Sequence, residues 1–126
     1  MNKKAKVLAI DDEEITLMLI SELLRKMDYN VFSTVDPVNG IELALKEKQD
    51  LILLDVYMPM RNGWSVLSQL RSDDDIRKTP VIILTSDDHV KSVELAYELG
   101  VASYLTKPVN PDLLKMKVAE LLGEKS

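Results

Sequence analysis

The amino-acid sequence predicts an α/β fold, a single-domain (βα)5 doubly wound parallel sheet with helices on both of its faces. Within the 126 residues, short apolar segments alternate five times with segments of helical periodicity. The apolar segments are nearly continuous rather than alternating, which is typical of parallel strands that are covered on both sides. No linker or low-complexity tract interrupts this order, so we expect one domain over residues 1–126 and no output domain.

Five short and mostly apolar segments carry the strand pattern. They are AKVLAI (5–10), NVFSTV (30–35), DLILLD (50–55), PVIIL (80–84) and ASYL (102–105), of which NVFSTV is the weakest. Helical periodicity covers the segments between and after them, at 14–27, 37–48, 64–73, 88–99 and 111–122. Pro37 and Pro111 suit the first turn of a helix and Gly100 suits a helix end, so three helix boundaries also carry local signals.

Composition and charge exclude several classes of protein. Apolar residues make up 46% of the chain and charged residues 29%, which is the balance of a soluble globular domain. The net charge of −5 argues against a protein that binds the nucleic-acid backbone, because such a protein needs a basic face. No apolar run approaches the length of a membrane span, and there is no cysteine for a disulfide or a thiolate metal site. We expect a cytoplasmic protein without direct contact to nucleic acid or membrane.

Polar residues follow four of the five predicted strands at the point where each strand ends. Asp11 and Asp12 follow the first strand, Asp55 ends the third, Thr85 follows the fourth, and Lys107 lies just beyond the fifth. In an open parallel sheet, ligands bind outside the carboxyl ends of the strands. These five side chains are therefore expected to lie together at one edge of the sheet.

Three carboxylates crowded at one edge repel each other, and burial disfavours their charged forms. A hard divalent cation relieves that repulsion, and Mg²⁺ commonly bridges carboxylates to a phosphate while it keeps several waters. Lys107 supplies a fixed positive charge, and Thr85 a hydrogen-bond donor, for the remaining phosphoryl oxygens. The cluster therefore predicts a magnesium site with room for a phosphoryl group.

Each residue of this cluster also has an ordinary structural interpretation. The acids from Asp11 to Glu14 are compatible with a helix start, where the helix dipole favours negative charge. Asp55 is compatible with a loop cap, Thr85 with a residue that merely favours strands, and Lys107 with a solvated loop lysine. Only the joint placement of these residues at one edge favours the functional interpretation, because each of them alone is a weak signal.

The motifs at these positions resemble the receiver domains of two-component response regulators, over essentially the whole chain and in the manner of a stand-alone chemotaxis regulator. AIDDE is similar to the acid pair after the first strand, ILTS supplies the threonine, and YLTKP supplies the switch aromatic and the lysine–proline pair. DVYMPMRNG matches the pattern D-x-x-M-P-x-x-x-G at Asp55, Met58, Pro59 and Gly63. The resemblance implies a flavodoxin-like sheet with the strand order 2-1-3-4-5.

The resemblance also implies a role for each residue of the cluster. Asp55 is expected to be the phosphoacceptor, which attacks a phosphohistidine and forms an acyl phosphate. Asp12, Asp55 and the backbone carbonyl of Tyr57 are expected to bind Mg²⁺ directly, and Asp11 is expected to act through a metal-bound water. Lys107 is expected to pair with the carboxylate or with the phosphoryl group.

Two residues are implied to switch with phosphorylation. Thr85 is expected to move toward a phosphoryl oxygen, and Tyr104 to turn inward into the space that Thr85 leaves. The surface of the helix at 88–99 is expected to report this change to partners.

The helix at 14–27 carries apolar residues outside its core face. Ile15 and Met18 lie off that face, near the acid edge, where a sensor histidine kinase or a histidine phosphotransfer protein is expected to dock. Ordinary exposed apolar surface is the alternative interpretation.

The helix at 88–99 carries a wider apolar arc than a sheet-covering helix needs. Leu95 and Leu99 are expected to face the sheet. That orientation leaves Val93 and Tyr97 for a downstream protein target, or for a second copy of the chain in a phosphorylation-dependent homodimer. A core face with one incidentally exposed tyrosine is the alternative.

Three other functions fit parts of the pattern. A phosphatase of the haloacid dehalogenase type needs a second acid two positions after the nucleophile, where Tyr57 stands. A nucleotide or flavin binder needs a glycine-rich or hydroxyl-rich loop after the first strand, where DDEEIT would repel phosphate. A phosphorylation-independent interaction or dimerisation module on the same fold stays open, although all five site positions are intact. We expect no enzyme activity beyond self-catalysed phosphotransfer and dephosphorylation.

Overall fold

The structure, a computed structural model, describes residues 4–58 and 61–123. The central sheet contains β1 (Lys6–Ile10), β2 (Asn30–Thr34), β3 (Leu51–Leu54), β6 (Val81–Thr85) and β7 (Ser103–Thr106). The helices are α1 (Glu14–Lys26), α2 (Pro37–Lys46), α3 (Gly63–Ser72), α4 (Val90–Glu98) and α5 (Pro111–Leu122). None of the helices in these described ranges has the length and apolarity needed to cross a bilayer.

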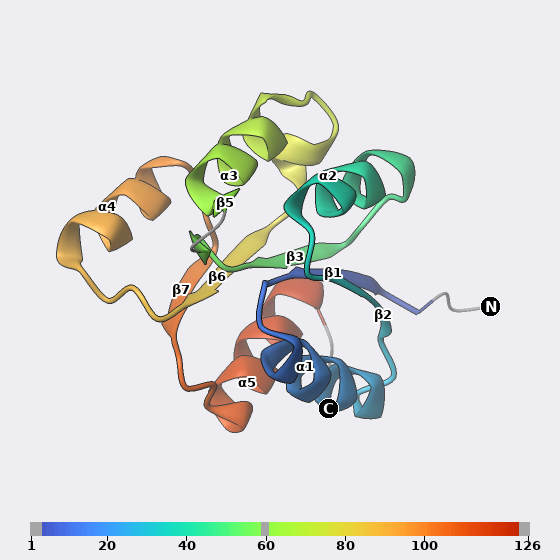
Figure 1. Cartoon of the computed structure of the whole chain (residues 1–126). Helices are drawn as coiled ribbons and strands as arrows, with labels where there is room; N and C mark the ends of the chain where they lie inside the picture. Colours follow the sequence, from blue (N-terminus) through green and yellow to red (C-terminus); the bar gives the residue numbers. More distant parts are fainter. Residues whose placement is uncertain (1–3, 59–60, 124–126) are drawn as a thin grey trace.

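The five strands run parallel in the order β2-β1-β3-β6-β7, which confirms the predicted (βα)5 fold and its 2-1-3-4-5 order (Figure 1). The order reverses beside β1, because the chain first moves outward to β2 and then returns to β3 on the other side of β1. Ile10 and Leu54, the last residues of β1 and β3, are paired at this point. The residues that follow them, Asp11 and Asp55, therefore leave the sheet side by side where an open sheet binds its ligands.

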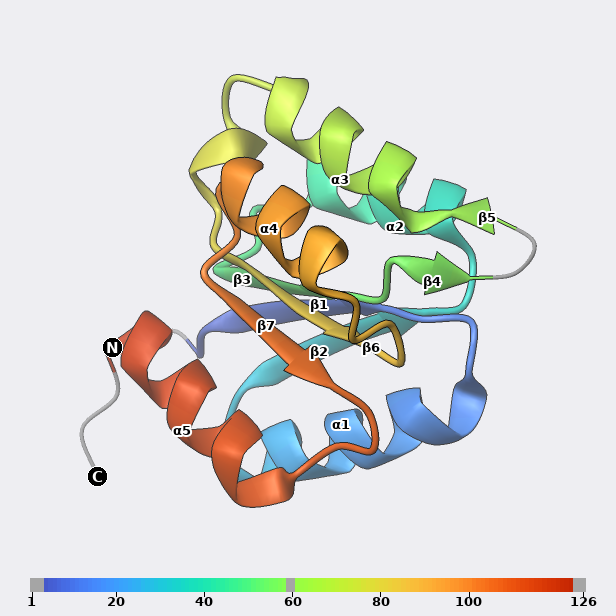
Figure 2. The ribbon, with the colours of Figure 1, turned by 90° about the vertical axis from the view of Figure 1, so that its left-hand side faces the viewer.

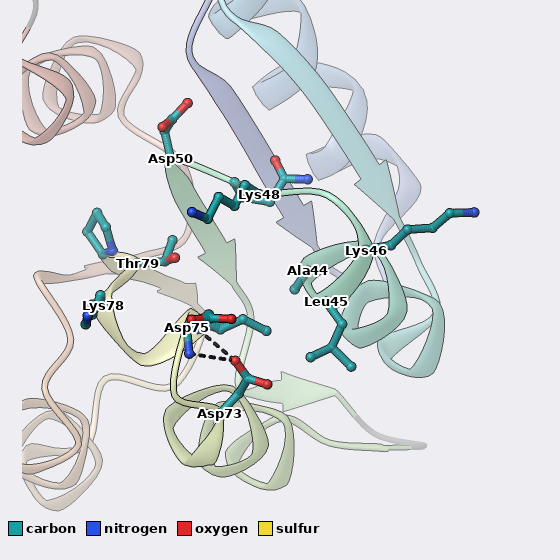
Figure 3. A pocket seen from close by; sticks show the side chains of 12 residues that line it. Ala44, Leu45, Lys46, Lys48, Asp50, Asp73, Asp75, Lys78 and Thr79 are labelled. Carbon is teal, nitrogen blue, oxygen red and sulfur yellow. Dashed lines mark hydrogen bonds between the residues drawn. The ribbon is translucent and has the colours of Figure 1, made fainter.

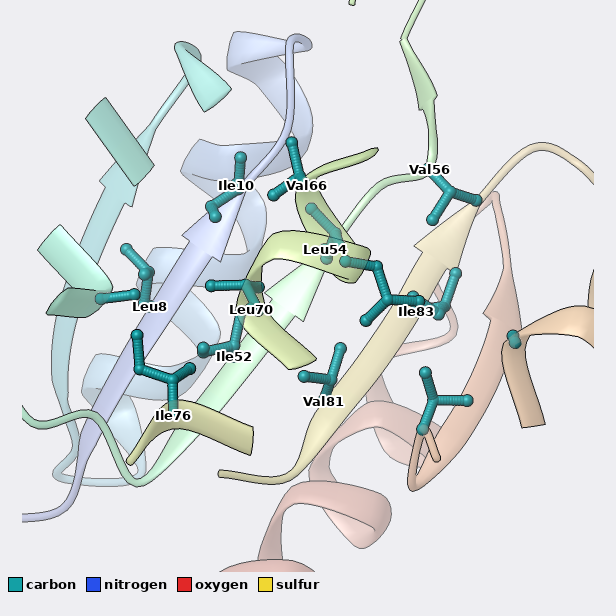
Figure 4. Packing of buried hydrophobic residues seen from close by; sticks show 14 residues of the cluster. Leu8, Ile10, Ile52, Leu54, Val56, Val66, Leu70, Ile76, Val81 and Ile83 are labelled. Carbon is teal, nitrogen blue, oxygen red and sulfur yellow. The ribbon is translucent and has the colours of Figure 1, made fainter. Parts of the chain in front are cut away.

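Helices α1 and α5 cover one face of the sheet, and α2, α3 and α4 cover the other (Figures 1 and 2). Successive strand residues point to opposite faces, so Val7 and Ala9 pack under α1 and α5 while Leu8 packs on the other side. The core on that other side (Figure 4) includes Leu8, Ile10, Ile52, Leu54, Val66, Leu70, Ile76, Val81 and Ile83. The strands β1, β3 and β6 are buried on both faces, which explains their continuous apolar runs.

The structure adds two short elements that the apolar pattern does not predict. A hairpin of β4 (Tyr57–Met58) and β5 (Arg61–Asn62) lies between β3 and α3, and one turn of 3-10 helix, η1 (Ile76–Lys78), precedes β6. Pro59 of the predicted motif lies outside the described residues. Both elements are too short to show a periodic pattern.

Helix α4 begins at Val90, two residues later than its periodicity indicates. The carboxylate of Asp87 accepts the backbone N–H of His89 at 3.0 Å, and His89 itself has an extended backbone. An aspartate that accepts a hydrogen bond from the residue two positions on stabilises a turn in competition with a helix. The helix therefore starts only after this turn.

The inner face of α4 is rotated from the predicted one. Ala96 is fully buried, whereas Leu95, which the periodicity assigns to the core, is 41% exposed. Val93 and Leu99 lie three positions before and after Ala96, so they share its face and are half-buried. Leu95 and Tyr97 are each turned by about 100° from Ala96 and lie on opposite flanks. The small side chain of Ala96 lets the helix approach the sheet there. The predictions that Leu95 faces the sheet and that Val93 is exposed were therefore wrong. Leu99 faces inward and Tyr97 outward, as predicted.

Gly63 is fixed by a close approach of two backbone segments. A β-carbon added at Gly63 would lie 2.4 Å from the Cα of Val56 and 2.6 Å from the carbonyl oxygen of Asp55. Both contacts are with backbone atoms, so no side-chain rotation can relieve them. Helix α3 therefore starts directly against the segment that carries Asp55.

We expect Gly63→Ala to lower the free energy of unfolding by roughly 1–3 kcal/mol, because the backbone after β3 must move to admit the methyl group. Gly40→Ala is the matched control, since a β-carbon at Gly40 would meet the side chain of Ile10, with its nearest atom at 2.5 Å, rather than backbone. Urea denaturation of both variants measures the difference. A loss in Gly63→Ala no larger than that in Gly40→Ala would contradict the close-approach argument.

Candidate functional site

Three of the predicted site residues are positioned by backbone hydrogen bonds that continue the sheet past its strand ends. Each donates its N–H to a carbonyl of a neighbouring strand: Asp11 to Thr34 at 3.2 Å, Asp55 to Ile10 at 3.0 Å, and Lys107 to Thr85 at 2.8 Å. Lys107 is followed by a cis peptide bond to Pro108. The main chain of the site is therefore fixed by the sheet itself, before any side-chain contact is considered.

The carboxylates of Asp11, Asp12 and Asp55 converge at this edge of the sheet. One oxygen of each lies within 4.8 Å of the others. Asp11 and Asp55 are buried, whereas Asp12 faces solvent. Across residues 4–58 and 61–123, no other group of acidic or histidine side chains has this spacing. The structure thus brings together acids from two separate strand ends.

The ammonium group of Lys107 lies among these carboxylates. Its Nζ is 2.9 Å from Oδ2 of Asp11, 2.9 Å from Oδ2 of Asp55 and 2.5 Å from Oε1 of Glu13. Glu13 is absent from the site predicted from the sequence. Its position directly after the acid pair, at the same strand end, is the signal that could have identified it.

Burial and pairing change the acid–base behaviour of this cluster. Burial raises the pKa of Asp11 from its ordinary 3.8 to about 6, although the N–H of Glu13 and the ammonium of Lys107 offset part of that effect. Burial disfavours the charged form of Lys107, but its hydrogen bonds to Glu13, Asp11 and Asp55 outweigh this and raise its pKa. The hydrogen bond from Lys107 in turn lowers the pKa of Glu13. Lys107 therefore remains a cation at neutral pH.

The donor set at this edge fits a hard divalent cation. Lys107 pairs with the carboxylates of Asp11, Glu13 and Asp55, and that of Asp12 lies close to Asp11 and Asp55, so the edge holds four carboxylates beside one ammonium group. Carboxylate oxygens close enough to share one ion are the ligands that Mg²⁺ prefers. The N–H of Tyr57 donates to Oδ1 of Asp55 at 2.8 Å and orients that carboxylate, while its carbonyl stays a predicted ligand.

Thr85 and Tyr104, the predicted switch residues, both contact the backbone of Asp87. Thr85 is fully buried at the end of β6, and its Oγ1 accepts the N–H of Asp87 at 3.3 Å. The hydroxyl of Tyr104, which is half-buried, donates to the carbonyl oxygen of Asp87 at 2.5 Å. Burial, followed by the charges of Asp87, Asp55 and Asp88, raises the pKa of Tyr104 to about 12, so this hydroxyl keeps its proton.

The side chain of Asp87 connects the same loop to the start of α4. Its Oδ2 accepts the hydroxyl of Ser92 at 2.7 Å, and its Oδ1 lies 2.7 Å from Nδ1 of His89. The hydrogen bond from Ser92 lowers the pKa of Asp87, and His89 adds to this effect. Asp87 therefore joins both predicted switch residues to α4.

Most of the side chains predicted to face partners lie on the surface. Ile15 and Met18 are 74% and 70% exposed on α1, which starts just beyond the acid pair. On α4, Tyr97 is 52% exposed, whereas Val93 is half-buried. The two predicted partner residues of α1 are therefore more exposed than the two predicted ones of α4.

A hollow of about 500 Å³ lies at the other end of the sheet, between the end of α2 and the segment around η1 (Figure 3). Two of the carboxylates that line this hollow already accept hydrogen bonds from backbone N–H groups. Asp50 accepts the N–H of Lys6 at 2.7 Å, and Asp73 accepts the N–H groups of Asp75 and Ile76, both at 2.9 Å. This hollow lies at the amino ends of β3 and β6, whereas the acid edge lies at their carboxyl ends.

The raised pKa of Asp11 predicts a specific pH dependence in the absence of divalent cations. A carboxyl group that is a weaker acid in the folded state makes the fold less stable as pH rises through its pKa window, here from about 4 to about 6. At about 1.4 kcal/mol per pKa unit, the loss is on the order of 3 kcal/mol. Asp11→Asn does not titrate at this position. Urea denaturation should therefore show that its free energy of unfolding rises relative to that of the wild type across this window. Parallel pH profiles would contradict the assignment.

Known proteins share this sequence pattern and fold. Residues 7–119 match the family model of the response regulator receiver domain. Protein PilH of Pseudomonas aeruginosa is 34% identical over 120 residues, which cover 94% of this chain and 99% of PilH. The alkaline phosphatase synthesis transcriptional regulatory protein PhoP of Bacillus subtilis is 36% identical over 122 residues, 97% of this chain and 49% of PhoP, so the chain spans about half the length of that relative. The crystal structure of the Vibrio cholerae chemotaxis protein CheY4 has a TM-score of 0.88 at 28% identity, covering 95% of this chain and 100% of that one. The chain belongs to the response regulator receiver domain family.

Proposed function

We propose that the protein accepts a phosphoryl group on Asp55 from a sensor histidine kinase or a histidine phosphotransfer protein. The observation that carries this proposal is the convergence of Asp11, Asp12 and Asp55 with the ammonium of Lys107 at the carboxyl edge of the sheet. Such a site places one ammonium group and several potential metal ligands around one buried carboxylate. That arrangement suits transfer of an anionic group to the carboxylate itself.

The chain's own residues account for most of the requirements of the transfer. An oxygen of Asp55 forms a bond to phosphorus while the bond from phosphorus to the donor's imidazole nitrogen breaks, and the imidazole keeps the electron pair. Lys107, 2.9 Å from Asp55, places a fixed positive charge beside the new phosphoryl group. Asp12, Asp55 and the carbonyl of Tyr57 would hold Mg²⁺, with Asp11 acting through a water, and the ion would supply positive charge for the phosphoryl oxygens.

The loop between β6 and α4 offers a route from Asp55 to the surface. Movement of the Thr85 hydroxyl toward a phosphoryl oxygen would withdraw the acceptor that now holds the N–H of Asp87. Because Tyr104 and the start of α4 are tied to the same residue, they would respond together. In this proposal phosphorylation biases a two-state surface, and the chain does not turn over an external substrate.

The exposed apolar side chains fit the partners that such a receiver needs. Ile15 and Met18 lie near the acid edge, where the phosphodonor protein must reach Asp55, and their burial would favour its docking. Tyr97 on α4 suits a downstream protein target or a second copy of the chain in a phosphorylated homodimer. We place the protein in the cytoplasm, without direct contact to nucleic acid or membrane.

Incubation with acetyl phosphate and Mg²⁺ tests the proposal. Mass spectrometry should show one added phosphoryl group, located by peptide mapping on Asp55, and none when Mg²⁺ is chelated. Asp55→Asn should accept none, because an amide oxygen is a far weaker nucleophile. Asp50→Asn is the matched control, since Asp50 lies just before β3 and Asp55 just after it.

Equal labelling of Asp55→Asn and the wild type would contradict the assignment of the phosphoacceptor. A wild-type chain that stays unlabelled under all conditions would instead favour a phosphorylation-independent interaction module.

A further inference from the structure

The ammonium group of Lys107 donates hydrogen bonds to Glu13 and Asp55 and forms an ion pair with Asp11. An ammonium group carries three N–H bonds and no acceptor. Three carboxylates, those of Asp11, Glu13 and Asp55, already surround its Nζ at 2.9, 2.5 and 2.9 Å. A phosphoryl oxygen that approaches Nζ of Lys107 therefore competes with these three carboxylate contacts for the ammonium group.

The three carboxylates differ sharply in what their release would cost. The side chains of Asp11 and Asp55 are only 4% and 2% exposed, whereas that of Glu13 is 60% exposed. Asp11 would be left with an uncompensated buried charge if it lost its cation, which is strongly unfavourable. Asp55 is no longer a charged carboxylate once it is phosphorylated, but its remaining carbonyl oxygen can still accept a hydrogen bond from Lys107. Glu13 can exchange its contact for water, because its own carboxylate is exposed to solvent. Thr16, whose hydroxyl donates to the same Oε1 at 3.1 Å, still holds Glu13 in place afterwards.

We propose that Glu13 is an exchangeable partner of Lys107, which occupies the donor that a phosphoryl oxygen takes when Asp55 is phosphorylated. This inference rests on the proposed function and adds a regulatory contact to the same site. Glu13 acts through Lys107 and is therefore a positioning residue. It holds the ammonium group close to Asp55 before phosphorylation and competes with the phosphoryl group afterwards.

The competition has a measurable consequence for binding of a phosphoryl mimic. Glu13→Gln keeps the shape of the side chain and an acceptor for Thr16, but its neutral amide is a weaker partner for an ammonium group. Lys107 is then easier to recruit. We expect the variant to bind beryllofluoride, a mimic of the phosphoryl group on aspartate, about two- to fivefold more tightly than the wild type at saturating Mg²⁺.

Glu14→Gln is the matched control for this measurement. Glu14 is the next residue and is also exposed, and its replacement by glutamine removes the same charge from the same end of α1. Within the described residues, Lys107 makes no ion pair with it. Isothermal titration should therefore show that Glu14→Gln binds beryllofluoride with nearly the wild-type affinity. Urea denaturation should show similar stability for both variants, which separates a positioning role from a structural one.

A crystal structure of the wild-type chain with Mg²⁺ and beryllofluoride provides a second readout that needs no variant. Nζ of Lys107 should contact a fluorine atom and Asp55, while Glu13 lies beyond ion-pair distance. The inference is overturned if Glu13→Gln binds no more tightly than Glu14→Gln, or if Lys107 keeps Glu13 alongside the fluorine contact. In both cases the proposed function would stand. If the wild-type chain neither binds beryllofluoride nor accepts a phosphoryl group from acetyl phosphate, both the inference and the proposed function fail.

Discussion

The ammonium group of Lys107 is the contact on which the carboxyl edge of this sheet depends. Asp11 and Asp55 are buried side by side, and each lies 2.9 Å from Nζ of Lys107. Removing one partner from a buried ion pair typically destabilises a protein by about 3–5 kcal/mol, because the remaining charge is left without compensation. Even with Lys107 present, the pKa of Asp11 stays well above its ordinary value. The site is thus under electrostatic strain, and a second cation would relieve it.

The topology of the sheet brings this cluster together from distant parts of the chain. Asp11, Asp55 and Lys107 each leave the end of a parallel strand, and each is held by one backbone hydrogen bond to the neighbouring strand. Gly63 then lets α3 pack directly on the turn after Asp55. The loop after β6 connects the same edge to α4 through Asp87. A short series of hydrogen bonds therefore connects the acid cluster at this edge to α4, although the two are distant in sequence.

Much of this arrangement could be predicted from the sequence pattern, and the exceptions have physical reasons. The strands β1, β3 and β6 were predictable because burial on both faces demands continuous apolar runs, and the edge strand β2 gave the weakest signal because exposed residues interrupt its buried ones. Five site residues were predictable because each follows a strand end. Glu13 was not, since an exposed acid before a helix also suits the helix dipole. The rotation of α4 depends on how closely Ala96 approaches the sheet, which periodicity alone does not specify.

Binding of Mg²⁺ to the carboxyl edge tests the central claim most directly, and isothermal titration in the absence of any phosphodonor measures it. Asp12 is the informative residue, because it belongs to the acid cluster but faces solvent, so its replacement leaves the core intact. We predict one Mg²⁺ per wild-type chain and a loss of affinity of at least about tenfold in Asp12→Asn. Asp112→Asn, an exposed aspartate in the first turn of α5, should bind Mg²⁺ like the wild type. A wild-type chain that binds no Mg²⁺, or an Asp12→Asn variant that binds it equally well, would contradict the account.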